Sequence, residues 1–288
     1  MKSYNIKWNG FQLELGEKTC IMGILNTTPD SFSDGGKYFA HDAAVAHGLQ
    51  LVQDGADILD IGGESSRPFS EPVSAIEEME RVVPVIEKLS ARIDVPISID
   101  TTKAKVAYEA VKAGASIIND ISAFNIDPEM AGVAAENNIP VILMHMKGKP
   151  KTMQVNPLYD DLIQEIIDFL FQRADFAVKA GIKKKNIILD PGIGFGKTVE
   201  HNLMLIKYLK RIHDMGFPVL MGPSRKSFVQ KILSDINGKE ITAASVETGQ
   251  ATLAAVAACV MNGAHIVRVH DVAAVKPLIQ IIDAVLNV

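Results

Sequence analysis

Polar residues that can do chemistry recur at one kind of place in this chain, at the end of a short apolar run. The residues found there are Asn26, Asp60, Asp100, Asn119, His145, Asp190, Lys226, Arg268 and His270. Burying such a side chain without a partner costs roughly 2–7 kcal/mol, so stability alone does not explain the repetition. We interpret the convergence of acids, an amide and cations as a binding site for a small molecule.

The single members of this set differ in what they indicate. Asp60 precedes Gly62 and Gly63 and can serve either a turn or the site. An acid that ends the run Pro-Ile-Ser-Ile-Asp favours function for Asp100, and Asn119 is similar. His145, between two methionines, is interpreted as a satisfied residue of the wall.

Two basic segments favour an anion. Arg268 and His270 are two residues apart on one expected strand, so they project to the same face and can hold one anion together. The segment 224–226, Ser-Arg-Lys, opens a helical stretch where barrels often bind phosphate. A solvated basic turn is the alternative interpretation of this second segment.

The glycine-rich run from Gly192 to Thr198 is not a nucleotide-binding P-loop. That motif has four residues between its first glycine and its Gly-Lys pair, whereas this chain has three. A turn whose backbone approaches a flat ligand beside Asp190 is the simpler interpretation, and a purely conformational loop is the alternative.

Eight apolar runs and eight helical patterns alternate along the chain and must position these residues. Expected strands lie near 22–25, 57–61, 96–99, 116–118, 140–144, 186–189, 218–221 and 265–269, and expected helices near 40–55, 73–91, 103–113, 127–137, 159–180, 200–215, 245–262 and 272–286. A looser stretch is expected over 233–242. Runs 4–8 and 11–15 flank Asn9-Gly10, which predicts a hairpin.

The pattern predicts an α/β fold, a (β/α)₈ TIM barrel with an N-terminal β-hairpin. We expect one domain over 1–288, with the hairpin in 1–16 and the barrel in 20–288. Active sites of such barrels lie at the carboxyl ends of the strands, where the polar residues fall. A doubly wound sheet is the alternative fold, although no linker appears near the middle beyond the loop 147–157.

Composition and charge limit the classes of partner that the chain is expected to bind. The chain of 288 residues is 48% hydrophobic and 22% charged, with a net charge of -5. It has no basic stripe for nucleic acid, no polybasic segment for a membrane surface and no apolar leader, so we expect a cytoplasmic protein with neither partner. Its two cysteines, Cys20 and Cys259, have no CxxC neighbour and are expected to be buried thiols.

The ordered motifs resemble those of the dihydropteroate synthases, pterin-binding barrel enzymes of folate synthesis, along nearly the whole chain. The matching stretches are 26–36 (NTTPDSFSDGG), 63–68 (GESSRP), 98–101 (SIDT), 118–120 (IND), 189–197 (LDPGIGFGK), 224–227 (SRKS) and 268–271 (RVHD). Seven stretches in the right order make the resemblance highly specific.

The resemblance implies an enzyme that condenses 6-hydroxymethyl-7,8-dihydropterin diphosphate with p-aminobenzoate, giving 7,8-dihydropteroate and diphosphate. It implies that sulfonamides target this class, that Mg²⁺ assists, and that the later helices form a homodimer. The pterin-binding residues that it implies are Asp100, Asn119, Met144, Asp190, Gly194, Phe195 and Lys226.

The same resemblance assigns the remaining roles. It implies diphosphate binding by Asn26, Arg67, Arg268 and His270, which with Lys226 form the catalytic set. It implies a metal site at Asn26 and Asp34, and p-aminobenzoate binding by Phe32, Ser66, Arg67, Pro68 and Ser224. This chain has Ser66 where members commonly have Thr, and Phe69-Ser70-Glu71 where a Gly commonly follows.

Three other functions stay open at this point. A methyltetrahydrofolate corrinoid methyltransferase shares the fold and pterin pocket but needs no diphosphate site, so Arg268 and His270 disfavour it. A pterin-binding barrel without catalytic activity would bind pterin and not p-aminobenzoate. A metal-dependent amidohydrolase would have a His-x-His pair where this chain has Asn26-Thr27-Thr28.

Overall fold

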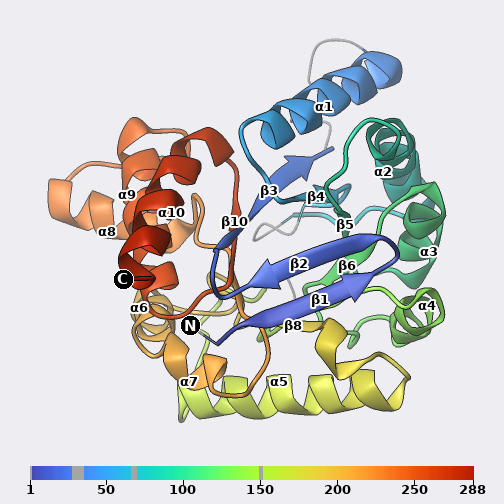
Figure 1. Cartoon of the computed structure of the whole chain (residues 1–288). Helices are drawn as coiled ribbons and strands as arrows, with labels where there is room; N and C mark the ends of the chain where they lie inside the picture. The colour runs from blue at the N-terminus through green and yellow to red at the C-terminus, as the bar shows by residue number, and fades with distance from the viewer. Residues whose placement is uncertain (1, 28–35, 66–69, 149–151) are drawn as a thin grey trace.

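A ring of eight parallel strands surrounded by helices forms the main body, and a two-stranded hairpin lies across one end (Figure 1). The computed structural model describes residues 2–27, 36–65, 70–148 and 152–288. The barrel predicted from the sequence is confirmed, and the doubly wound sheet is excluded.

The eight strands follow chain order around most of the ring. They are β3 (Cys20–Asn26), β4 (Ile58–Gly62), β5 (Ile97–Asp100), β6 (Ile117–Asp120), β7 (Val141–Met144), β8 (Ile187–Asp190), β9 (Leu220–Met221) and β10 (Ile266–Val269), paired in the order β8-β7-β6-β5-β4-β3-β10-β9. A parallel bridge between Leu189 and Val219 joins β8 to the β9 segment and closes the ring. The strands are buried along nearly their whole length, which explains their continuous Ile, Leu and Val runs.

Ten helices are described around the ring. They are α1 (Gly36–Gln53), α2 (Ala75–Ser90), α3 (Ala104–Ala113), α4 (Met130–Asn137), α5 (Leu162–Lys179), α6 (Val199–Lys207), α7 (Leu209–His213), α8 (Ser227–Asn237), α9 (Val246–Met261) and α10 (Val272–Leu286), with a short 3₁₀ turn at Lys184–Asn186. Side chains of Ser74, Asp161, Ser245 and Asp271 accept backbone N–H bonds at the starts of α2, α5, α9 and α10. These caps satisfy donors that a helix start leaves unpaired.

Two helical expectations were wrong in detail. The predicted helix 200–215 is two helices, α6 and α7, because Tyr208 between them leaves helical geometry at φ -105° and ψ 17°. The predicted loose stretch 233–242 begins inside α8, where Ile232 and Leu233 follow the buried Phe228 and Val229 and pack against the core. Helix α8 then ends at Gly238 in the left-handed conformation.

The N-terminal hairpin forms as predicted and covers the amino end of the barrel. Strands β1 (Tyr4–Trp8) and β2 (Phe11–Leu15) are antiparallel, joined by Asn9 and Gly10 with φ of 41° and 87°. Ile6, Trp8, Leu13 and Leu15 are buried, so one face of the hairpin joins the core. His265, just before β10, contacts the edge of the Tyr4 ring.

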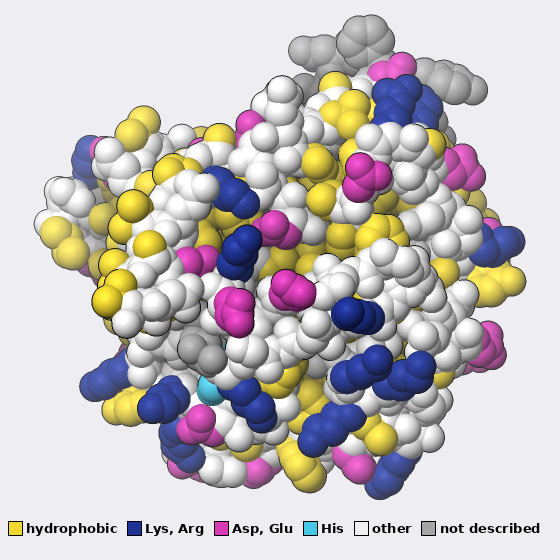
Figure 2. All heavy atoms as spheres, in the orientation of Figure 1, with side chains coloured by type: hydrophobic (Ala, Val, Ile, Leu, Met, Phe, Trp, Pro, Cys, Tyr) yellow, Lys and Arg dark blue, Asp and Glu magenta, His cyan; other side chains and the backbone are white. Residues whose placement is uncertain are grey.

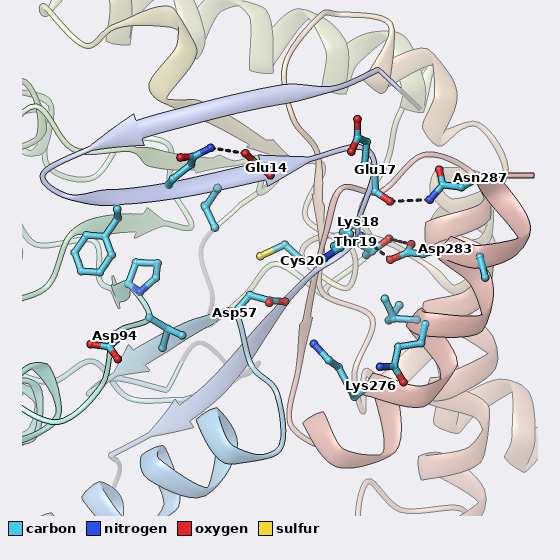
Figure 3. A pocket seen from close by; sticks show the side chains of 18 of the residues that line it. Glu14, Glu17, Lys18, Thr19, Cys20, Asp57, Asp94, Lys276, Asp283 and Asn287 are labelled. Carbon is cyan, nitrogen blue, oxygen red and sulfur yellow. Dashed lines mark hydrogen bonds between the residues drawn. The ribbon is translucent and has the colours of Figure 1, made fainter.

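Between β2, α10 and the starts of three barrel strands the hairpin leaves a cavity of about 740 Å³ (Figure 3). On this face charged side chains of both signs surround an apolar hollow (Figure 2). Asp283 of α10 accepts hydrogen bonds from the backbone N and the Oγ1 of Thr19, at 2.9 and 2.7 Å. Asp57 accepts one from Ile21 N at 2.8 Å, and Lys276 donates to Gly55 O at 3.1 Å.

No helix within the described residues is long and apolar enough to cross a membrane.

Candidate active site

Polar side chains from five strands and two loops meet at the opposite, carboxyl end of the barrel. Strand register accounts for part of this meeting, since Asp100 pairs with Asn119 and Met144 pairs with Asp190. A small pocket there is lined by Asp100, Asn119, Ile121, Met144, Asp190, Ile193, Phe195, Gly222, Lys226 and Arg268. The structure thus brings together six of the seven residues assigned to pterin, with Gly194 between two lining residues.

A network of charged groups crosses this end from β10 to β4 and β5. Arg268 donates from Nε to Asp60 Oδ2 at 2.5 Å and from an Nη atom to Asp100 Oδ2 at 2.7 Å. Asn119 Nδ2 donates to the same Asp60 oxygen at 3.1 Å. The sequence left open whether Asp60 serves a turn or the site. In the structure it is fully buried and bonds two predicted site residues, Arg268 and Asn119.

The other oxygen of Asp60 has no hydrogen-bond partner among the described residues. Burial raises the pKa of the neighbouring Asp100 to about 7. Arg268 opposes this rise, whereas the charges of Asp60 and Glu78 add to it. A carboxyl group with this pKa is near half protonation at neutral pH. It can therefore accept or donate a hydrogen bond in the working range of an enzyme.

Asp190 ends β8 and begins the glycine-rich turn. Its Oδ1 accepts a hydrogen bond from Gly192 N at 2.7 Å, and burial raises its pKa to about 6 although Lys226, Lys197 and Arg268 oppose the rise. The turn continues through Gly194 at φ +84°, where a Cβ atom would lie 2.9 Å from the side chain of Lys226. The positive φ, which L side chains rarely adopt, together with this close approach favours glycine here.

Lys226 and Phe195 form one wall of the pocket together. The Lys226 Nζ lies 4.0 Å from the centre of the Phe195 ring, within the range of a cation–π interaction. Both residues were assigned to the pterin site. The aromatic ring and the ammonium group present a flat apolar surface beside a hydrogen-bond donor.

Ser224 and His270, assigned to different substrates, contact each other. The Ser224 Oγ lies 3.0 Å from His270 Nδ1 and also accepts a longer bond from the His270 backbone N at 3.3 Å. His270 follows β10 directly, two residues after Arg268. Whereas the sequence predicted that Arg268 and His270 hold one anion, the guanidinium of Arg268 is here bonded to Asp60 and Asp100.

Asn26 ends β3, where it pairs in register with Gly62 at the end of β4. The adjacent Thr27 holds this edge by donating from its backbone N and its Oγ1 to Gly62 O, at 2.9 and 3.1 Å. These bonds fix the backbone on the carboxyl side of Asn26 against the end of β4. The predicted residues Phe32, Asp34, Ser66, Arg67 and Pro68, and the divergent Phe69, lie outside the described residues.

The start of the second loop is held by partly buried ion pairs of Lys103. Lys103, at the start of α3, contacts Glu64 of this loop and donates to Glu78 Oε2 at 2.6 Å. Arg81 of α2 donates to Gly63 O at 2.7 Å. These contacts hold the Gly63 carbonyl and the Glu64 side chain in place.

Sequence reasoning missed part of the pocket. Ile121, Ile193 and Gly222 also line it. Ile121 directly follows β6, Ile193 lies three residues after the end of β8, and Gly222 directly follows β9. Their position just past a strand end was the available signal, but apolar residues there resemble ordinary core. His145 is buried and contacts the Phe169 ring edge-on, as expected of a wall residue.

Comparison with known proteins gives consistent matches over nearly the whole chain. A family profile described as "Pterin binding enzyme" matches residues 22–270. The dihydropteroate synthase of Synechocystis sp. is 48% identical over 269 residues, which are 93% of this chain and 91% of the relative.

Solved structures agree with that match. The Xanthomonas albilineans dihydropteroate synthase with 4-aminobenzoic acid is 42% identical and superposes with a TM-score of 0.88, covering 100% of both chains. The Yersinia pestis dihydropteroate synthase in a sulfonamide drug complex is also 42% identical, with a TM-score of 0.90 over 99% of this chain and 100% of that one.

Proposed function

The chain belongs to the pterin-binding enzymes as a member of the dihydropteroate synthase family, and we propose how its residues carry out that family's reaction. The amino group of p-aminobenzoate displaces diphosphate from C9 of 6-hydroxymethyl-7,8-dihydropterin diphosphate and gives 7,8-dihydropteroate. The observation that carries the proposed assignment is the meeting of Asp100, Asn119, Asp190 and Lys226 around one pocket.

These four residues match the polar edge of a pterin. The aminopyrimidinone ring has N–H donors for the carboxylates of Asp100 and Asp190, and a carbonyl and ring nitrogen for Lys226. Asn119 is held by Asp60, which fixes the direction of its amide. A site that buries such partners can reject an analogue lacking them by about 10⁴-fold.

We assign the diphosphate to the rim of the pocket, between Asn26, Arg268 and His270, with Arg67 as a further contact from the second loop. Arg268 offers a planar set of donors suited to phosphate oxygens. Stabilising the leaving diphosphate is the main catalytic task in this proposal. When C9 gains positive charge before the amine attacks, the reaction needs no strong general base.

We propose Mg²⁺ as the metal, with Asn26 and Asp34 as its protein ligands. Among the residues that the structure describes, no group of three or more His, Cys, Asp or Glu side chains can hold a metal ion. One amide oxygen at Asn26 suits an ion that keeps waters and takes most of its ligands from diphosphate. When bound, the ion supplies charge neutralisation for the leaving group.

We place p-aminobenzoate next to Ser224, against the segment that carries Phe32 and the segment that carries Ser66, Arg67 and Pro68. The Xanthomonas relative binds 4-aminobenzoic acid and the Yersinia relative binds a sulfonamide, which supports this assignment. Sulfonamide inhibition follows from it as a proposal for this chain.

Two further expectations stay predictions. A homodimer through the later helices is supported by exposed apolar side chains on α8 and α9, namely Ile236, Val246 and Met261. Equilibrium sedimentation of the full chain measures it directly. The cytoplasmic location also stays a prediction.

The proposal is tested by measuring diphosphate release from the purified chain with dihydropterin diphosphate, p-aminobenzoate and Mg²⁺. We expect turnover that stops when p-aminobenzoate is omitted and that falls when the metal is chelated. If pterin binds while diphosphate is never released, the protein is a binding module and the proposed reaction is wrong. If chelation leaves turnover unchanged, the metal assignment fails and the remainder stands.

A further inference from the structure

A buried lysine lies behind the glycine-rich turn and is not used by the reaction described above. Lys197 is 3% exposed, and it is not among the residues that line the pocket. Its Nζ donates to Phe195 O at 2.9 Å and lies 3.0 Å from His145 Nδ1. An ammonium group is rarely buried without a function or an ion-pair partner.

The direction of the contact between Lys197 and His145 follows from burial. Burial lowers the pKa of His145 to about 2, with Lys197 contributing to the fall, so the ring is neutral at any physiological pH. A neutral ring whose Nδ1 faces an ammonium group accepts the hydrogen bond there. Lys197 is therefore the donor to both partners, and it ties the turn to the residue that follows β7.

The other backbone groups of the turn are held by neutral side chains. Gly194 N donates to Asn202 Oδ1 at 2.6 Å, and Gly194 O accepts from Gln154 Nε2 at 2.5 Å. Gly196 O accepts from the Tyr159 hydroxyl at 2.8 Å. Among these contacts within the described chain, Lys197 alone brings a charged donor to the turn.

The turn held in this way presents Phe195 to the pocket, with Lys226 above the ring. The charge of Lys197 also reaches the pocket, because it lowers the pKa of Asp190 against the rise that burial causes. In return Asp190 opposes the fall to about 7 that burial imposes on the pKa of Lys197. The two groups thus favour each other's charged form.

We propose that Lys197 is a positioning residue for the pterin pocket. Its ammonium group clamps the Phe195 carbonyl to His145 and maintains a positive charge behind Asp190. The inference rests on the proposed function only in naming pterin as the ligand. Lys197 acts through Phe195 and Asp190 and does not touch the substrate.

Between pH 5 and 7 Lys197 is mainly in its ammonium form, and a purely structural lysine would hold the turn equally well throughout that range. The pH dependence of binding below pH 7 therefore separates the two roles. Removing a cation next to a carboxyl raises its pKa. Without Lys197, Asp190 therefore becomes protonated at a higher pH, and pterin affinity declines earlier as the pH falls. The charged or titratable groups facing Asp190 and Lys197 from neighbouring elements are His145, Lys147, Tyr159, His201, Lys226, Cys259 and Arg268.

The experiment compares Lys197→Met with wild type in the full chain. The probe is 6-hydroxymethyl-7,8-dihydropterin without its diphosphate, so that no phosphate titrates, and calorimetry gives Kd between pH 5 and 8.5. We expect Lys197→Met to raise Kd about tenfold or more at pH 6.5, where the ammonium form of Lys197 prevails. We expect the acidic decline of affinity to move up by about one pH unit.

The matched control is Lys179→Met, which removes an exposed cation of α5 that pairs with Asp175. It should leave Kd within twofold of wild type. A folded Lys197→Met protein with wild-type Kd overturns the proposal. Weakening by one constant factor between pH 5 and 7 overturns it as well, because that result describes a structural lysine.

His145→Phe tests the same clamp if Lys197→Met does not fold. The variant keeps a ring against Phe169 and removes the acceptor, leaving the lysine in place. We expect a smaller rise in Kd with a shift in the same direction, and an unchanged Kd and pH profile would contradict the clamp. Diphosphate release by the wild type, measured in parallel, shows separately whether the proposed reaction holds.

Discussion

Both ends of the barrel carry acidic and basic side chains, but these side chains bond the backbone at the amino end and line a ligand pocket at the carboxyl end. At the amino end, below the hairpin, Asp57 and Asp283 accept backbone N–H bonds from the chain entering β3, and Lys276 donates to a carbonyl (Figure 3). At the carboxyl end, burial raises the pKa values of Asp100 and Asp190 to about 7 and about 6. The larger cavity belongs to the amino end.

This difference shows that the size of a cavity is a poor guide to where chemistry occurs. The amino-end acids are used to fix the backbone, and their surroundings match their charge. The carboxyl-end acids are so deeply buried that their pKa values rise although Arg268 and Lys226 oppose the rise, an environment that is typical of a ligand site. Functional sites in barrels tend to store such unfavourable arrangements.

The largest expected effect comes from Arg268→Ala. It leaves Asp60 and Asp100 facing each other without their shared cation, so we expect the free energy of unfolding to fall by about 2–4 kcal/mol, a figure reduced for the 19% exposure of the arginine. Diphosphate affinity should fall about 10²-fold. Urea unfolding and calorimetry measure the two effects.

Arg268→Lys is the control for this change, since it keeps the charge without the planar pair of donors. It should recover part of the stability and little of the diphosphate affinity. A stable Arg268→Ala protein would mean that the two carboxyls do not depend on this cation.

Lys226→Ala should weaken dihydropterin binding by about 10²–10³-fold, because a partly buried charged donor is lost from the pocket. Equilibrium binding by calorimetry checks this. The matched variant at the amino end is Asp94→Asn, which removes an exposed charge that lines the large cavity. Loss of pterin affinity in Asp94→Asn would break the distinction between the two ends.

Asp190→Asn should stabilise the protein while abolishing pterin binding. Because the pKa of Asp190 is raised in the folded state, its contribution to stability is full below about pH 4 and is lost as the pH rises through about 6. The neutral amide keeps an oxygen for Gly192 N and avoids this loss. We expect roughly 1–2 kcal/mol more stability at pH 8 and no gain at pH 4.

Thermal unfolding at the two pH values measures this difference. A variant that is less stable than wild type at pH 8 would show that the buried charge is well compensated, against the contrast drawn between the two ends.

The smallest effect is expected at the amino end, from Asp283→Asn. The variant weakens two hydrogen bonds to Thr19, so the free energy of unfolding should fall by about 1 kcal/mol. Steady-state kinetics should stay at wild-type values, since α10 meets β3 far from the pocket. A changed KM for either substrate would couple the two ends and contradict their separation.

Much of the fold was readable in the sequence because its signals are local. Apolar runs of strand length, the Asn9-Gly10 turn and the alternation of strands with helices predicted the hairpin and the barrel. Helix details failed at α8, which continues to Asn237 in a stretch predicted to be loose, and at Tyr208, where a helix breaks without proline or glycine. Neither failure affects which strand ends meet.

The site was readable to the extent that it follows from strand ends. Asp100, Asn119, Asp190, Lys226 and Arg268 all lie where a barrel must bring them together. Asp60 stayed open between a turn and the site, since a sequence shows that a residue ends a strand but not what it contacts. Its bonds to Arg268 and Asn119 resolved that choice.

The sequence by itself determined the barrel, the end at which chemistry occurs and the residue types available there, since strand period and strand ends are local properties. Only the tertiary structure decided which of those residues share a charge. Arg268 bonds carboxylates 168 and 208 residues away, and Lys197 reaches His145 across 52. Such pairings, and the pKa shifts that burial creates, depend on distances that exist only once the ring has closed.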